Sequence, residues 1–115
     1  MIITFKNNAA KKQFSPEYMR TWKYPEKVAE KLLATENYIR NAASLLDVVN
    51  YRPFHFHRLK GDRDHEWSIY LGNTGYRVTL MPCNDLGEPI REGDIVSQCK
   101  VIKIVMVTEV SNHYE

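Results

Sequence analysis

The sequence predicts a single α+β domain over residues 1–115, with two or three helices packed on one face of a twisted, mostly antiparallel β-sheet. Apolar residues recur at helical spacing in residues 25–50. Apolar and polar residues alternate in residues 66–80, and β-branched residues fill residues 101–107. A chain of 115 residues, of which 43% are hydrophobic, can bury one core without a disulfide or metal staple.

The N-terminal part predicts a strand followed by short helices. Residues 1–5 are apolar and β-branched, which is typical of a short strand. Residues 6–14 carry apolar side chains at helical spacing and are expected to form a short helix. Ser15 precedes Pro16, a common helix start, so we expect a further helical segment from there to Trp22.

The longest helix is expected to begin at Pro25. An apolar stripe predicts that it packs on the core, and the stripe consists of Val28, Leu32, Ile39, Ala43 and Leu46. The pattern loosens at residues 41–44, which leaves open a break between two helices. Pro53 is expected to end the helical part, because a proline favours extended geometry in the residue before it.

The second half is expected to consist mostly of strands. Residues 67–71 and 76–80 alternate around a glycine-rich turn and predict a β-hairpin with one buried face. Residues 82–100 hold turn-forming residues and acids, which predict a long exposed loop or an extended hairpin tip. Residues 101–107 predict a central strand buried on both faces, and residues 108–115 a polar tail.

Composition also sets expectations about location. No apolar run reaches the ~18–20 residues that span a bilayer, and the N-terminus lacks the pattern of a signal peptide. The chain has two cysteines, Cys83 and Cys99. We therefore expect a cytoplasmic protein with no membrane partner and with reduced thiols, while a Cys83–Cys99 bridge across a loop remains an alternative.

The formal net charge of +2 is unevenly distributed. Residues 1–63 hold 12 Lys and Arg against 6 Asp and Glu, and residues 64–115 hold 4 against 8. This asymmetry fits a basic face that binds a polyanion. It fits equally well a folded chain in which the two halves mix and their charges cancel.

A basic stretch in residues 55–63 concentrates groups suited to phosphodiester cleavage, namely His55, His57, Arg58, Lys60 and Arg63. Cleavage of RNA requires a base for the 2′-hydroxyl, cations for the phosphorane and an acid for the leaving oxygen. Histidine serves as base or acid, and arginine grips phosphate oxygens in pairs. On composition alone, an ordinary basic surface strand is the simpler interpretation.

Two further places carry candidate groups. The C-terminal cluster follows the predicted central strand, whose end can deliver functional side chains, and it consists of Glu109, Asn112, His113 and Tyr114. The alternative there is a frayed polar tail. Arg77 lies on the polar face of the predicted hairpin, where it is suited to grip a phosphate. An ion pair with Glu66 or Glu109 is the alternative for Arg77.

Cofactor and metal motifs are weak. His55 and His57 have no second ligand pair at zinc spacing, so no metal site is expected. The glycine motifs that bind nucleotide phosphates or dinucleotides are absent from the sequence, so no cofactor is expected.

Three motifs give the chain a family resemblance: HRLKGDR at residues 57–63, EWSI at residues 66–69 and GYRVT at residues 75–79. Together they resemble the HigB-like toxins of the RelE/ParE superfamily, whose pattern is roughly His-x-Leu-Lys-Gly-Asp, x-Trp-Ser-Ile and aromatic-Arg-Ile/Val-Thr. The late apolar strand and its Glu-Val-Ser-Asn-His-Tyr continuation resemble the C-terminal strand and tail of the family. The resemblance covers most of the chain but is weak in residues 6–24, and the 82–100 loop is longer than in compact members.

The resemblance implies a RelE-like fold and a toxin of a type II toxin–antitoxin pair. Such toxins enter the ribosomal A site and cut mRNA there without a metal, and a helix-turn-helix antitoxin protein is the expected partner. Residue by residue, His57 and Lys60 match the catalytic histidine and lysine, and Arg77 matches the arginine of the central hairpin. Arg58 and Arg63 are expected to hold the RNA backbone.

The resemblance extends with one departure into the C-terminal cluster. Glu109 falls near an acidic position of the family and, with Asn112, is expected to contact RNA. His113 and Tyr114 fall near a terminal Tyr-His pair whose order is reversed here. Because neighbours on a strand face opposite ways, the reversal leaves open which of the two enters the site.

Two other functions remain open. The same fold hosts gyrase-inhibiting toxins, which generally lack the His/Lys pair, so RNA cleavage is the first hypothesis and gyrase inhibition the second. A non-catalytic module that binds only an antitoxin is the third. His55 has no counterpart in the family pattern and is expected to be a bystander.

Overall fold

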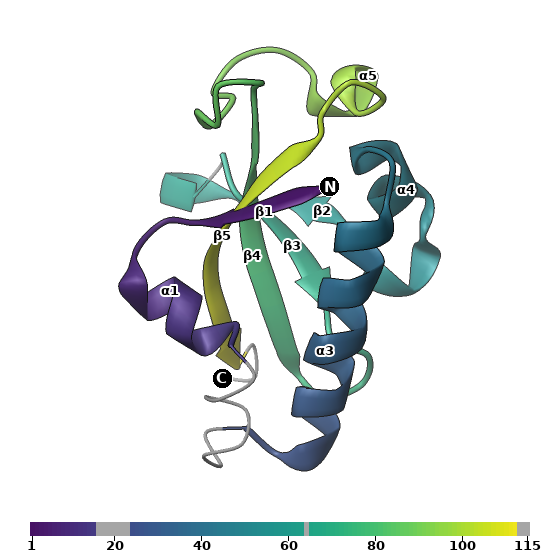
Figure 1. The fold of residues 1–115 in the computed structure, drawn as a ribbon, viewed down its shortest axis with the longest axis vertical. Coiled ribbons are helices and arrows are strands. Elements are labelled where there is room, and N and C mark those ends of the chain that lie inside the picture. Colours follow the sequence, from purple (N-terminus) through teal and green to yellow (C-terminus); the bar gives the residue numbers. More distant parts are fainter. Residues whose placement is uncertain (16–23, 64, 113–115) are drawn as a thin grey trace.

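The computed structural model describes residues 1–15, 24–63 and 65–112 (Figure 1). The expected helical segment from Ser15 to Trp22 falls almost wholly outside these ranges. Helices are α1 (Asn8–Gln13), α3 (Glu26–Asn41), α4 (Leu45–Asn50) and α5 (Ile95–Gln98), with two 3-10 turns, η1 (Arg52–Phe54) and η2 (Gly61–Arg63). Strands are β1 (Ile2–Phe5), β2 (His57–Arg58), β3 (Trp67–Tyr70), β4 (Tyr76–Cys83) and β5 (Ile104–Asn112).

These strands form one five-stranded sheet in the order β1-β5-β4-β3-β2. The pairs β2–β3, β3–β4 and β4–β5 are antiparallel, and only β1 pairs with β5 in parallel. The predicted α+β class with a mostly antiparallel sheet is therefore confirmed. None of the helices in the described ranges has the length and apolar character needed to cross a bilayer.

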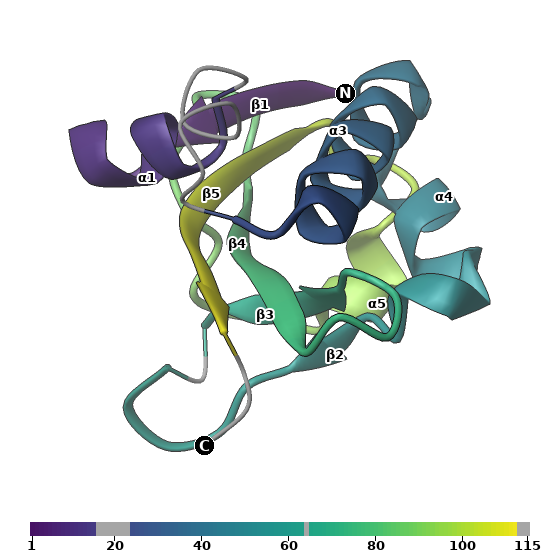
Figure 2. The ribbon, with the colours of Figure 1, turned by 90° about the horizontal axis from the view of Figure 1, so that it is seen from below.

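Helix α3 lies across one face of the sheet (Figure 2). Its buried side chains include three residues of the predicted apolar stripe, Val28, Leu32 and Ile39. They join one core cluster with sheet residues such as Ile69 and Val105, both fully buried. Complete burial of a side chain of this kind stabilises the fold by roughly 1.5–3 kcal/mol.

The chain breaks between two helices at residues 42–44, within the region where the apolar pattern of the sequence loosens. Helix α3 ends at Asn41, and the side chain of Ser44 caps α4 by accepting a hydrogen bond from the Leu46 N–H. The expected end of the helical part at residues 50–53 is confirmed, since α4 ends at Asn50, but the extended geometry expected before Pro53 is wrong, because Arg52 and Pro53 lie inside η1. A proline is tolerated in a first helical turn, where its missing N–H would have no partner anyway.

Strand β4 extends beyond the predicted end of the hairpin at residue 80 and reaches Cys83. Pro82 lies within it, and its carbonyl accepts a hydrogen bond of 2.9 Å from the Ile90 N–H. The N–H and C=O of one strand residue point to the same edge. The missing N–H of Pro82 therefore faces away from β5, where no strand ladder requires it.

The expectation of an exposed loop over residues 82–100 is only partly correct. Leu86 is 84% exposed, but Ile95, Cys99 and Ile102 are buried in the core. Two main-chain hydrogen bonds connect the segment after α5 to the start of α4. The Leu46 N–H donates to the Cys99 carbonyl, and the Leu45 N–H donates to the Ile102 carbonyl. Cys83 and Cys99 are both buried and free, and burial raises the pKa of the Cys83 thiol.

Strand β5 is central, as predicted, with β1 on one side and β4 on the other. Burial on both faces is wrong: Val105 and Val107 are fully buried, whereas Ile104 and Met106 remain partly exposed. The strand begins at Ile104 instead of the predicted residue 101, and it continues to Asn112. Residues 108–112, which were expected to belong to a polar tail, are therefore part of the strand. A sheet with one buried and one solvated face produces this alternation.

Helix α1 covers the edge of β5 where β1 ends. The pairing of β1 with β5 ends at Phe5 and Val107, and the next residue, Lys6, donates a hydrogen bond of 3.0 Å from its N–H to the Val107 carbonyl. Further along, the Gln13 side chain accepts a 3.1 Å hydrogen bond from the N–H of Val110. A glutamine side chain thus satisfies a strand donor that would otherwise lack a partner.

Replacing Gln13 tests this edge contact. Gln13→Ala should lower the free energy of unfolding by about 1–2 kcal/mol, because it leaves the partly buried N–H of Val110 without an acceptor. Urea unfolding measures the change. The neighbouring exposed residue gives the control, since Lys12→Ala should stay within about 0.5 kcal/mol. Equal loss in both variants would contradict the assigned role of Gln13.

Candidate functional site

The sheet face opposite α3 carries a cluster of polar side chains that we name the polar face: His57, Ser68, Tyr70, Arg77, Thr79 and Glu109. The strand register aligns them, since Ser68 lies between His57 and Thr79 across three strands. Thr79 in turn pairs with Glu109, and Tyr70 pairs with Arg77. Residues that are paired across strands share a face, so these side chains point to the same side of the sheet.

His57 is half-buried on this face and has a defined orientation. Its Nδ1 lies 2.7 Å from the main-chain carbonyl oxygen of His55. A carbonyl oxygen only accepts hydrogen bonds, so Nδ1 carries the hydrogen. In the neutral ring Nε2 then holds the lone pair, and none of the described residues bonds to it. This tautomer is the one that presents Nε2 as a proton acceptor.

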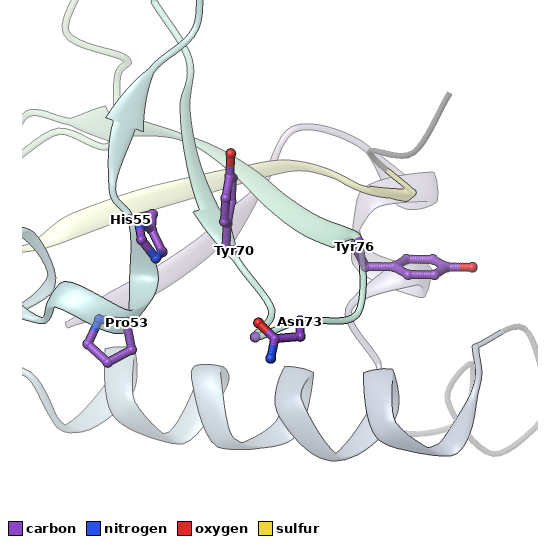
Figure 3. Close-up of a pocket in the computed structure, with 7 residues that line it drawn as sticks. Pro53, His55, Tyr70, Asn73 and Tyr76 are labelled. Carbon is purple, nitrogen blue, oxygen red and sulfur yellow. The ribbon is translucent and has the colours of Figure 1, made fainter.

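Tyr70 lies between two imidazole rings. Its ring centroid is 5.2 Å from that of His55 and 5.5 Å from that of His57, which it meets edge-on at 90°. Figure 3 shows the His55 and Tyr70 rings side by side, while Tyr76 points away from them. They line a pocket of about 630 Å³, together with Pro53, Gly72, Asn73, Gly75 and Tyr76. Aromatic rings at the rim of such a space are suited to stacking on a planar base.

Arg77, on the polar face, forms no ion pair with any residue that the structure describes. Neither of the ion pairs that the sequence left open, with Glu66 or with Glu109, is formed. The Nε of Arg77 is buried and has no hydrogen-bond partner among the described residues, and the same holds for Ser68 Oγ. A buried donor without a partner costs about 1–3 kcal/mol. An anion with several acceptor oxygens, such as a phosphate, would satisfy it.

Both glutamates pair instead with Arg63. Its Nε and Nη2 each donate to the Glu66 carboxylate at 2.8 Å, and Nη1 lies 3.2 Å from Glu109. Nη2 also donates to Thr79 Oγ1 at 3.3 Å. One side chain from η2 thus links Glu66, the residue before β3, to β4 and β5. Arg63, expected to hold RNA, has much of its hydrogen-bonding capacity engaged within the protein.

This ion pair changes the proton affinity of both partners. The hydrogen bond to Arg63 is the largest effect on Glu66 and lowers the pKa of its carboxyl group, with Thr108 Oγ1 donating a further hydrogen bond. The hydrogen bond to Glu66 in turn raises the pKa of the Arg63 guanidinium. Both groups are therefore charged at neutral pH and neutralise each other.

Arg58 lies off the polar face, and Lys60 follows the edge strand β2. Arg58 pairs with Trp67, a core residue, so its side chain leaves β2 on the α3 side of the sheet. Lys60 is exposed in the short connection between β2 and η2, and it forms no ion pair with any described residue. Its flexible side chain is therefore available to solvent near the β2 edge.

The C-terminal candidates divide into described and undescribed residues. Glu109 lies on the polar face but is paired with Arg63. Asn112 is exposed at the end of β5, opposite Tyr76. His113 and Tyr114 lie outside the described residues, so their predicted roles stay predictions.

Three residues of the polar face were absent from the sequence-based candidates: Ser68, Tyr70 and Thr79. The predicted hairpin could have revealed Ser68 and Tyr70. They alternate with the buried residues of their strand, and Tyr70 lies opposite Arg77 on the neighbouring strand. His55 was discarded for lack of a family counterpart, although its carbonyl contacts His57.

Comparisons with known proteins add no assignment. No family model matches the sequence, and no curated protein matches it significantly. Within the described ranges, no group of three or more His, Cys, Asp or Glu residues is arranged to hold a metal ion.

Acid should weaken the fold through Glu66. Its folded pKa is lowered, so its contribution to stability is present above the ordinary glutamate pKa and is lost as the pH falls through the folded value. Between about pH 6 and pH 3, the parent should therefore lose more unfolding free energy than Glu66→Gln. At neutral pH the variant should be about 1–2 kcal/mol less stable.

Glu36→Gln is the matched control, because Glu36 pairs within α3 with Arg40 at 3.0 Å, and the side chain of Arg40 is 46% exposed. A single pair of this kind within one helix, with its cation open to solvent, contributes about 0.3–0.5 kcal/mol, so this variant should follow the parent within about 0.5 kcal/mol at each pH. If the two glutamine variants show the same pH dependence, Glu66 does not have the stabilising role described.

Proposed function

We propose that this protein is a RelE/HigB-like toxin of a type II toxin–antitoxin pair, acting as a ribosome-dependent endoribonuclease that cuts mRNA in the A site. The observation that carries this hypothesis is His57 on the polar face, with Nδ1 bonded to a carbonyl and Nε2 left as a proton acceptor. Arg77, whose Nε has no partner within the described ranges, adds a cation for the phosphate. A helix-turn-helix antitoxin would be the cognate partner.

The spacing of the two groups suits one ribose–phosphate unit. His57 on β2 and Arg77 on β4 are separated by β3, so their strands lie about 10 Å apart. Between them the floor consists of Ser68 and the ring of Tyr70. A nucleotide over this floor would place its sugar towards one group and its phosphate towards the other.

In the proposed reaction, Nε2 of His57 takes the proton of the 2′-hydroxyl. The oxygen attacks the adjacent phosphorus, and Arg77 and Lys60 stabilise the charged phosphorane. The bond to the 5′-oxygen breaks, and that oxygen takes a proton from a general acid, the role we assign to His113 or Tyr114. The products are a 2′,3′-cyclic phosphate and a 5′-hydroxyl end.

The balance of formal charges around this face favours binding of a polyanion, because Arg77 and Lys60 outweigh the remaining charge of the Arg63 network. Two free carboxylates beside the site would repel phosphates, but Glu66 and Glu109 share Arg63, which reduces their combined formal charge from −2 to −1. The remaining cations, Arg77 and Lys60, are not paired within the described residues. The local field available to RNA is therefore positive.

Substitution of the proposed groups tests the function. His57→Ala should slow mRNA cleavage on programmed ribosomes by about 100-fold or more, because it removes the base. Lys60→Ala and Arg77→Ala should each slow it by about 10–1000-fold through loss of phosphorane stabilisation. Lys100→Ala, an exposed lysine next to α5, is the control and should cut at the parent rate.

Primer extension on translated mRNA after induction, with and without the antitoxin, gives the readout. A His57→Ala variant that arrests growth and cuts mRNA at the parent rate would refute the assignment. Growth arrest with intact mRNA and DNA damage would indicate gyrase inhibition instead. Antitoxin binding without any growth arrest would indicate a non-catalytic module.

A further inference from the structure

His55 has an unusual backbone conformation. It is the only non-glycine residue of the described chain with a positive φ, at φ 46° and ψ 46°. This left-handed conformation costs roughly 1–2 kcal/mol for most residues, although histidine is among the side chains found there more often. His55 ends η1, where its N–H donates to the Arg52 carbonyl at 3.0 Å, and it leads the chain into β2.

The left-handed turn directs the His55 carbonyl at the His57 ring. In a regular strand, carbonyls point towards neighbouring strands, whereas side chains stand perpendicular to the sheet. A carbonyl in a strand is therefore not aimed at the side chain two residues later. The 2.7 Å contact between His55 O and His57 Nδ1 thus depends on the turn at His55.

Tyr70 supports the same arrangement from the next strand. The His55 ring lies at 37° to the Tyr70 ring, and the His57 ring meets the same tyrosine at 90°. Both imidazoles therefore rest on one aromatic side chain that is fixed by the β3–β4 pairing. The contact limits rotation of the His57 ring about its own side-chain bonds.

We infer that His55 is a positioning residue, whose main-chain carbonyl fixes the tautomer and the orientation of His57 so that Nε2 acts as the base. Its effect on cleavage rests on the proposed function, but its effect on the His57 ring does not. The backbone conformation carries the role, and the His55 imidazole does not take part in the chemistry.

Four substitutions separate the backbone from the side chain, because all of them remove the imidazole. His55→Gly and His55→Asn accept a positive φ and should keep the Nδ1–H tautomer of His57, with cleavage within about threefold of the parent. His55→Val and His55→Ala disfavour that φ, the β-branched valine most strongly. They should lose the tautomer and cut about 10–100-fold more slowly, since small misplacements of a catalytic group have effects of this size.

Nitrogen-15 NMR of the neutral His57 ring reads the tautomer without RNA or ribosomes, and cleavage on ribosomes is the second readout. The alanine variant serves if the valine variant does not fold. Two results would overturn the inference: the parent tautomer in both His55→Ala and His55→Val, or equal loss in all four variants. If the tautomer follows the predicted order but the parent cuts no mRNA, the positioning role stands and the proposed function fails.

Discussion

Burial of one sheet face beneath α3 determines which side chains reach the other face. Ile69, Val78 and Val107 are completely buried in the core. A shift of one residue in register would expose all of them, so their burial fixes the register. The residues that alternate with these buried ones must then point to the opposite side of the sheet. Ser68, Thr79 and their neighbours therefore lie on the polar face. The candidate site is in this sense a consequence of core packing.

A break in the β4–β5 register adds to this face. The register shifts between Thr79 and Leu80, which leaves Thr108 as an extra residue on β5. Its hydroxyl contacts both the Thr79 hydroxyl, at 2.8 Å, and the Glu66 carboxylate. Bulges of this kind often redirect side chains next to active sites. Here the bulge and Arg63 together gather two carboxylates into one network with a formal charge of −1. Among the described residues, His57 Nε2 and the Arg77 guanidinium remain without a protein partner.

The sequence predicted those parts of the fold that depend on local periodicity. The helices around residues 25–50, the hairpin and the central position of β5 follow from spacing and alternation, and so does the place of Arg77 on the polar face of the hairpin. Tertiary contacts decide the rest. Burial of Ile95 and Cys99, the pairing of Arg63 with Glu66 and Glu109, and the left-handed backbone of His55 each depend on neighbours distant in sequence or on the path between two elements.

The chemical nature of the RNA ends produced on ribosomes tests the central claim most directly. Purified protein, ribosomes and a defined mRNA suffice, with the ends identified by their reactivity towards kinase and phosphatase. Attack by a 2′-hydroxyl, with His57 as its base, predicts a 2′,3′-cyclic phosphate or its hydrolysis product upstream and a 5′-hydroxyl downstream. A 3′-hydroxyl with a 5′-phosphate, or mRNA that stays intact, would contradict an RNA-cleaving site on the polar face.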